Sequence, residues 1–231
     1  MSLTFVDYHS QGNANLGGTS LTTATFTTTA GNYLIAHVRP NGVTVSSIVD
    51  TAGHITFSPV GTGPDGGRFY LASVPSTDAS NAIKVTFSGA TIFQGLAVWQ
   101  FTPSGIPVFD NEATALTPSG ASVSSSSFNT NYLNEIVVAV FYPNALLTTW
   151  TQGLGYTTDG LNSGTQTYFG SEHRIYSSQQ TGLTATGTWS PGSTTGVMYT
   201  ASFGFGLPFT GGVAISGMEG LNRNITWLQQ L

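Results

Sequence analysis

Two widely spaced blocks of this chain repeat at one fixed offset. The run "FTTTAGNYLIAHV" (26–38) aligns with "FNTNYLNEIVVAV" (128–140), and "VTFSGATIFQGLAVWQF" (85–101) aligns with "GTWSPGSTTGVMYTASF" (187–203), both at a shift of 102 residues without a gap. Self-similarity at a fixed spacing is the signature of repeated structural units. We therefore predict two homologous halves, residues 1–104 and 105–206, followed by a Gly-rich C-terminal tail, residues 207–231.

Short runs of β-branched and aromatic residues fill both halves. Examples are "RFYLASV", "AIKVTF" and "EHRIYS", and turn sequences such as "RPNG", "GPDGG" and "SPGS" separate such runs. Apart from the tail, no segment keeps a helical period for long. The pattern predicts an all-β fold of two tandem antiparallel β-sandwich halves, of jelly-roll or Ig-like kind. It leaves open whether the halves share one core.

Charged side chains are rare. They make up 6% of the residues, against about 25% in an ordinary globular domain. The five Lys and Arg residues do not cluster and the net charge is -5, which argues against nucleic acid and an anionic membrane surface as partners. No apolar run approaches the roughly 18 residues of a membrane span, so we expect no membrane insertion.

The chain contains no cysteine, which excludes disulfides and Cys-based metal sites and leaves the compartment open. The start, "MSLTFVDYHS", has neither the basic nor the apolar region of a secretion signal. Either the chain is made in the cytosol, as virion proteins are, or the numbering begins after a removed signal, as in exported surface proteins.

The first half carries "VSSIVDTAG" (45–53) between "TAGNYLIAHV" and "AIKVTFSGA". This order resembles a family of Ser/Thr/Gly-rich duplicated β-sandwich modules in bacterial extracellular or surface proteins and phage-associated proteins. The resemblance covers roughly residues 5–205, with His54 where the family usually has Asn and Ile55 where Thr is common. It implies a non-catalytic surface, adhesive or virion module, and it implies no catalytic residue.

Thr23, Thr25, Thr27 and Thr29 have the same parity, so in a strand they would share one face. Such a row could face ice, face a glycan, or form the solvent side of a sheet. Ice binding needs several flat, stacked rungs, and Thr has a high β propensity. We therefore interpret the row as a solvent-facing surface in a chain that avoids charge.

The histidines have ordinary structural explanations. His37 lies mid-strand, where a hydrogen-bonded structural role is expected. Asp7 and His9 are two residues apart, so a strand would place both on one side. Glu172 and His173 are adjacent, so a strand would place them on opposite sides. Two partners from one strand can begin a metal site but cannot complete it, so we expect no metal.

Motifs for catalysis are missing from the sequence. It has no G-x-S-x-G, H-E-x-x-H or D-x-D-x-D-G pattern. Four of its ten acidic residues occupy turn-like sequence, where Asp has a local structural role: Asp50, Asp65, Asp78 and Asp159. We expect neither an enzyme nor a cofactor.

Aromatic residues offer one functional hint. Trp99 and Trp189 lie in aligned strands and are expected in the core. Trp150 and Tyr156 lie in loop-like sequence and are the candidates for an exposed, ligand-binding platform for sugars.

The tail offers another hint, because a Gly-rich tether ends in an apolar segment that is either a short helix or a last strand. This segment would dock on a neighbour or pack on its own sandwich. Its candidate assembly residues are Leu221, Ile225, Trp227, Leu228 and Leu231.

These features lead to one functional expectation and one alternative. We expect a structural subunit of an extracellular or virion assembly (a fibre, capsid decoration or surface filament) that associates with itself or a scaffold protein through neutral β faces and the tail. The alternative is a carbohydrate-binding or adhesion module that uses loop aromatics to bind glycans.

Overall fold

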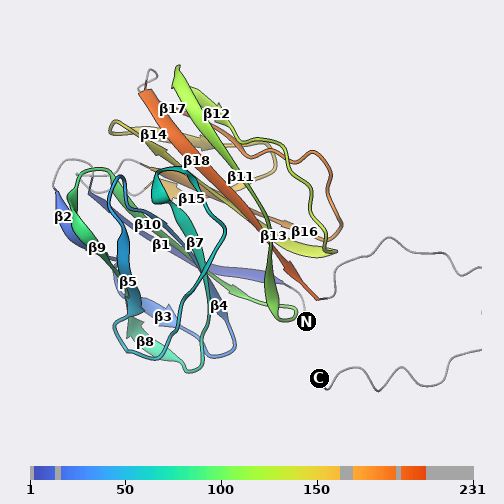
Figure 1. The fold of residues 1–231 in the computed structure, drawn as a ribbon. Helices are drawn as coiled ribbons and strands as arrows, with labels where there is room; N and C mark the ends of the chain where they lie inside the picture. Colours follow the sequence, from blue (N-terminus) through green and yellow to red (C-terminus); the bar gives the residue numbers. More distant parts are fainter. Residues whose placement is uncertain (1–2, 14–16, 162–168, 191–193, 207–231) are drawn as a thin grey trace, which may run out of the picture.

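The computed structural model describes residues 3–13, 17–161, 169–190 and 194–206 (Figure 1). Within these residues the chain forms strands and one short 3-10 turn, η1 (Pro64–Gly66). The strands of the first half are β1 (Thr4–Asn13), β2 (Gly18–Thr22), β3 (Phe26–Thr28), β4 (Tyr33–Arg39), β5 (Val45–Asp50), β6 (Ser58–Val60), β7 (Arg68–Ser73), β8 (Asp78–Asn81), β9 (Ile83–Thr91) and β10 (Gln94–Thr102). Those of the second half are β11 (Pro107–Gly120), β12 (Ser122–Ser124), β13 (Asn134–Pro143), β14 (Thr149–Gln152), β15 (Thr157–Leu161), β16 (Gly170–Tyr176), β17 (Thr186–Ser190) and β18 (Thr194–Phe205).

The first half pairs its strands as nested antiparallel partners. β1 pairs with β10, β2 with β9, β3 with β8 and β4 with β7. The resulting sheets have the orders β1-β10-β4-β7-β6 and β2-β9-β5. A long antiparallel hairpin rolled up so that its strands alternate between two sheets is a jelly roll, which is the architecture of this half.

The second half repeats this arrangement. Its sheets have the orders β11-β18-β13-β16-β15 and β12-β17-β14. A single bridge between Phe128 and Leu183 stands where β3 and β8 pair in the first half. A bulge at Phe109–Asn111 in β11 matches the bulge at Phe5–Asp7 in β1. The predicted fold, all-β with two tandem antiparallel sandwich halves, is confirmed. The tail, residues 207–231, lies outside the described residues.

The two five-stranded sheets pack face to face and share a central core (Figure 1). Trp99 and Phe101 of β10 lie in this core with Ala201 and Phe203 of β18, the equivalent positions of the second half. Each half also has a core of its own between its large and its small sheet. The body is therefore four layers thick, and both faces of each large sheet are buried.

Burial on both faces explains the continuous apolar runs in the sequence. Every residue of β10 from Gln94 to Phe101 is buried, as is every residue of β13 after Asn134. Sheets with one solvated face show alternation, whereas strands buried on both sides read as uninterrupted apolar segments.

Polar groups inside the central core also join the halves. His37 is fully buried and its Nδ1 lies 3.1 Å from the Tyr142 hydroxyl. Burial and the nearby Arg39 hold the pKa of His37 well below its usual range. Arg39 donates to Asn144 Oδ1 at 3.1 Å and approaches Asp65 at 3.8 Å. The structural role expected for His37 agrees with this placement.

The segment 45–53, which carries the family resemblance, ends β5 in a tight turn. The Asp50 carboxylate accepts hydrogen bonds from the backbone N–H of His54 (3.2 Å) and Ile55 (2.9 Å) and from Asn81 Nδ2 (3.1 Å). Burial alone raises the pKa of Asp50, but these hydrogen bonds outweigh burial and hold it below its usual value. Asp50 therefore fixes the turn, as its sequence context predicts.

None of the described residues belongs to a helix that is long and apolar enough to cross a membrane.

Candidate functional site

The outer small sheet of the second half carries a face of hydroxyl groups. Ser122 of β12 and Thr151 of β14 both lie opposite Thr188 of β17, and Ser124 lies opposite Thr186. Thr186 is half-buried, and the other outward Ser and Thr side chains of these three strands are exposed. We call this set the hydroxyl face: Ser122, Ser124, Thr149, Thr151, Thr186, Thr188 and Ser190. Every outward side chain along these strands is a Ser or Thr, so the face is neutral.

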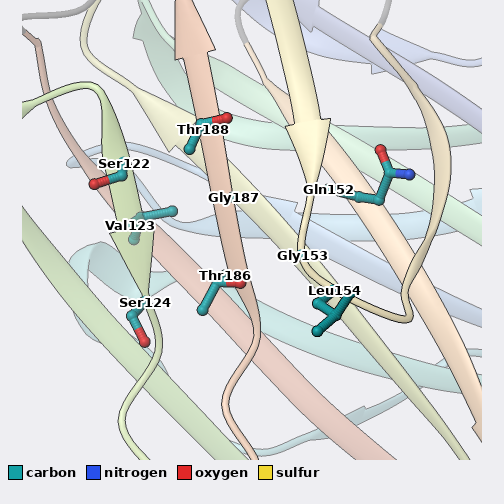
Figure 2. Close-up of a pocket in the computed structure, with 9 residues that line it drawn as sticks. All are labelled: Ser122, Val123, Ser124, Gln152, Gly153, Leu154, Thr186, Gly187 and Thr188. Carbon is teal, nitrogen blue, oxygen red and sulfur yellow. The ribbon is translucent and has the colours of Figure 1, made fainter.

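A shallow groove of about 370 Å³ crosses this face (Figure 2). Ser122, Ser124 and Thr188 line it, and Leu154, which is 97% exposed, stands at its end. The groove depends on Gly153, because a Cβ there would lie 2.6 Å from the carbonyl oxygen and the hydroxyl of Thr186. Donors, acceptors and one apolar rim residue suit a neutral polar ligand or a second protein surface.

Beneath the groove lies a buried acid. Glu172 of β16 is fully buried, and its Oε2 accepts the backbone N–H of Gly153 at 2.8 Å. Burial raises the pKa of Glu172 to about 8, and the charge of Asp159 acts in the same direction. Burial therefore favours the protonated form of Glu172, which holds the end of β14 from below.

The predicted aromatic platform is wrong as to exposure. Tyr156 is only 7% exposed, and Trp150 is half-buried with its indole nitrogen fully enclosed. Trp150 pairs with Trp189 across β14 and β17, so it shares the inward face, where it stacks on Phe141. Gly187 and Gly170 leave the space for its ring, because a Cβ at either residue would lie within 2.2 Å of the indole. Trp99 and Trp189 are buried as predicted.

Among the described residues, every Phe, Tyr and Trp side chain is buried or half-buried. The stacking surface on which many sugar-binding sandwiches depend is therefore missing from that part of the chain. The assembly residues predicted in the tail, Leu221, Ile225, Trp227, Leu228 and Leu231, lie outside the described residues.

The threonine row at residues 23–29 is not a single ladder. Thr25, Thr27 and Thr29 are exposed, in agreement with a solvent-facing surface. Thr23 is buried and accepts the Ile83 backbone N–H at 3.0 Å. The alternation fails because β2 ends at Thr22 and β3 begins only at Phe26.

An acid, an imidazole and an indole meet between the halves. Trp99 Nε1 of the first half donates to Asp159 Oδ2 at 2.6 Å, and the other oxygen of Asp159 is hydrogen-bonded to His173 Nδ1. The His173 ring stacks on Phe5 at 4.1 Å. The side chains of Asp159 and His173 are 1% and 8% exposed, so this contact locks the halves together rather than facing a substrate. The sequence predicted only a local turn role for Asp159 and gave no sign of this contact between the halves.

Other predicted neighbours behave as expected. His9 Nε2 lies 2.9 Å from Asp7 Oδ2 on one side of β1. Glu172 and His173 are separated by their strand, since one reaches Gly153 and the other Asp159. Within the described part of the chain, no three Asp, Glu, His or Cys side chains gather as a metal site.

Comparisons of this chain with protein-family models, with curated proteins and with solved structures gave no match.

Proposed function

We propose that this protein is a non-enzymatic structural subunit of an extracellular or virion assembly, and that copies associate through their neutral β faces. The observation that carries the proposal is the hydroxyl face, whose seven outward side chains are all Ser or Thr. A surface with no charge raises no electrostatic barrier against a second copy, whereas free soluble domains usually carry mixed charge that limits association.

The rigidity of the body supports the same proposal. The shared central core and the Trp99–Asp159 hydrogen bond join the halves into one unit. Such a unit holds its two outer sheets in a fixed relative position, which a building block that binds neighbours on both sides requires. Jelly rolls serve as viral capsid and lectin domains, and this analogy of fold agrees with a structural role.

The two outer sheets are not equivalent as contact surfaces. In the first half, Ser20 lies opposite Thr86 as Ser122 lies opposite Thr188 in the second. The first-half face also carries the charged Lys84 and the exposed Val49. We therefore assign the main contact to the hydroxyl face of the second half, with the tail as an additional docking segment.

The test is the native mass of the full chain by light scattering across a range of concentrations. We expect species larger than the 24.1 kDa monomer. Thr188→Lys, in the middle of the hydroxyl face, should return the protein to a monomer. The matched substitution Thr86→Lys, at the equivalent place in the first half, should leave the oligomer intact. A wild-type monomer at every concentration, or equal effects of both substitutions, would contradict the proposal.

One observation favours a second candidate function, the binding of a neutral glycan. The groove is lined by hydroxyls and by Gln152, which can hydrogen-bond to sugar hydroxyls. Thr188→Val would then weaken binding on a glycan array without changing the native mass. Deletion of residues 207–231 separates the two functions, because it should reduce assembly and leave glycan binding intact.

A further inference from the structure

Two carboxyl groups meet at one end of the large sheet of the second half. Asp110 is the extra residue of the β11 bulge, and Glu135 lies near the start of β13. β18 runs between these strands and supplies Ser202, whose hydroxyl lies 3.4 Å from Asp110 Oδ2. Bulges commonly turn a side chain toward a specific target, and this one brings Asp110 to the Glu135 side.

The first half has no acid at the equivalent places. Its bulge residue is Val6. In the structure, β4 and β13 correspond one residue further along than the ungapped 102-residue alignment of 26–38 with 128–140 predicts. Tyr33 opposes Phe101 as Ile136 opposes Phe203, so Asn32 takes the place of Glu135. Asn32 is satisfied there, since its Oδ1 accepts the Thr102 hydroxyl at 2.9 Å. The carboxyl pair is therefore a feature of the second half and not a requirement of the fold.

Glu135 is an incompletely satisfied group. It is fully buried, and neither carboxyl oxygen has a hydrogen bond of good geometry. Its carboxyl faces Asp110, the hydroxyl of Thr130 and the backbone N–H of Tyr132, and it takes part in no ion pair among the described residues. Burial, followed by the neighbouring Asp110, raises its pKa to about 8. A buried carboxyl that faces a second carboxyl and has no hydrogen bond of good geometry is costly, so a ligand bound by the pair would explain its retention.

We propose that Asp110 and Glu135 form a binding site for a divalent cation of the calcium type. The oxygens of Thr130 and Ser202 complete the set from the neighbouring loop and β18. Asn131 donates its backbone N–H to Asp110 Oδ2 at 2.9 Å and its side-chain Nδ2 to Asp110 Oδ1 at 2.7 Å. A half-turn of the side-chain amide would present a carbonyl oxygen instead, and the backbone N–H bond would remain.

The donor set selects the metal. All the side-chain donors are oxygens, as Ca²⁺ prefers, and none is the imidazole or thiolate typical of zinc sites. A bound cation would fix β11, β13, β18 and residues 130–131 to one another. This would stabilise the second half only in its folded form.

The experiment uses the full chain after treatment with EDTA. Thermal unfolding is followed at pH 7.5 with millimolar CaCl₂, with MgCl₂ or with EDTA alone, and calcium binding is measured by isothermal titration calorimetry. We expect CaCl₂ to raise the Tm by about 5 °C and MgCl₂ to have a smaller effect. Glu135→Gln and Asp110→Asn should each remove the response, and Glu172→Gln, a buried acid elsewhere, should keep it.

Two results would overturn the site. One is a wild-type protein that shows neither a Tm shift nor calorimetric binding, in which case the two carboxyls merely share a proton. The other is a calcium response that survives both Glu135→Gln and Asp110→Asn. Either result leaves the proposed assembly untouched, provided that the light-scattering measurement of native mass is also made in EDTA, where no calcium is bound.

Discussion

Replacing Glu172 with Gln should change how stability depends on pH. The pKa of Glu172 is about 8 in the folded protein, against 4.5 for the free group. The folded state therefore holds a proton that the unfolded chain releases. The stability contributed by this proton is complete below pH 4.5 and is lost as pH rises toward 8.

The size of the effect follows from the shift. Each pH unit across this interval is worth about 1.4 kcal/mol. Part of the titration lies outside the range from pH 5 to 8, so Glu172 should account for about 3 kcal/mol of lost stability there. Glu172→Gln keeps an oxygen that can accept the Gly153 N–H and cannot ionise. Its unfolding free energy should therefore fall less steeply with pH.

The assay is urea unfolding followed by tryptophan fluorescence at pH 5, 6.5 and 8 in EDTA. Other groups affect wild type and variant alike, so the difference between the two pH profiles isolates Glu172. We expect wild type and Glu172→Gln to diverge by about 3 kcal/mol between pH 5 and 8. Parallel profiles would refute the reasoning, because they would mean that Glu172 is ionised in the folded protein at neutral pH.

Three further substitutions test contacts that hold the fold. Asp50→Ala should cost about 2–4 kcal/mol in urea unfolding, because three donors lose their acceptor; the wild-type advantage should disappear as acid protonates Asp50, and an equal cost at pH 2 and pH 7 would contradict this. Gly187→Ala should lower the Tm through overpacking worth about 1–3 kcal/mol, since its Cβ would lie 2.1 Å from the Trp150 ring; adding Trp150→Leu should restore part of the loss. Trp99→Phe should cost about 1–3 kcal/mol by leaving one of the two oxygens of the buried Asp159 carboxylate, Oδ2, without its donor, and an unchanged Tm would show that the Trp99–Asp159 bond does not join the halves.

The sequence predicted the fold class and the two halves well. Strand patterns can be recognised from neighbouring residues, and the 102-residue repeat can be recognised by comparing the chain with itself. The same strand runs also carried a sign of the central core. Polar and apolar residues do not alternate in "GLAVWQF" and "NEIVVAV", which indicates strands buried on both faces of their sheets. A two-layer sandwich covers only one face of each sheet, so a further layer is needed. That signal could have predicted the face-to-face packing.

The candidate site was harder to predict, because it depends on register. Trp150 turns inward only because β14 pairs with β17 so that Trp150 meets Trp189. Asp159 reaches His173 through a bulge in β15. Strand pairing and bulges are set by contacts distant in sequence, so spacing alone could not show these side chains together.

The central core has a consequence for how the two halves are related. Each half contributes the same patch, β4 and β10 in one and β13 and β18 in the other, to a contact of apolar side chains. Surfaces that meet through equivalent residues form an isologous contact, as in a symmetric homodimer. Two separate copies of one half would make a contact of this kind as a homodimer. In the fused chain the equivalent positions differ: Trp99 corresponds to Ala201 at the 102-residue offset, and His37 corresponds to Val140 through the one-residue slip of β13.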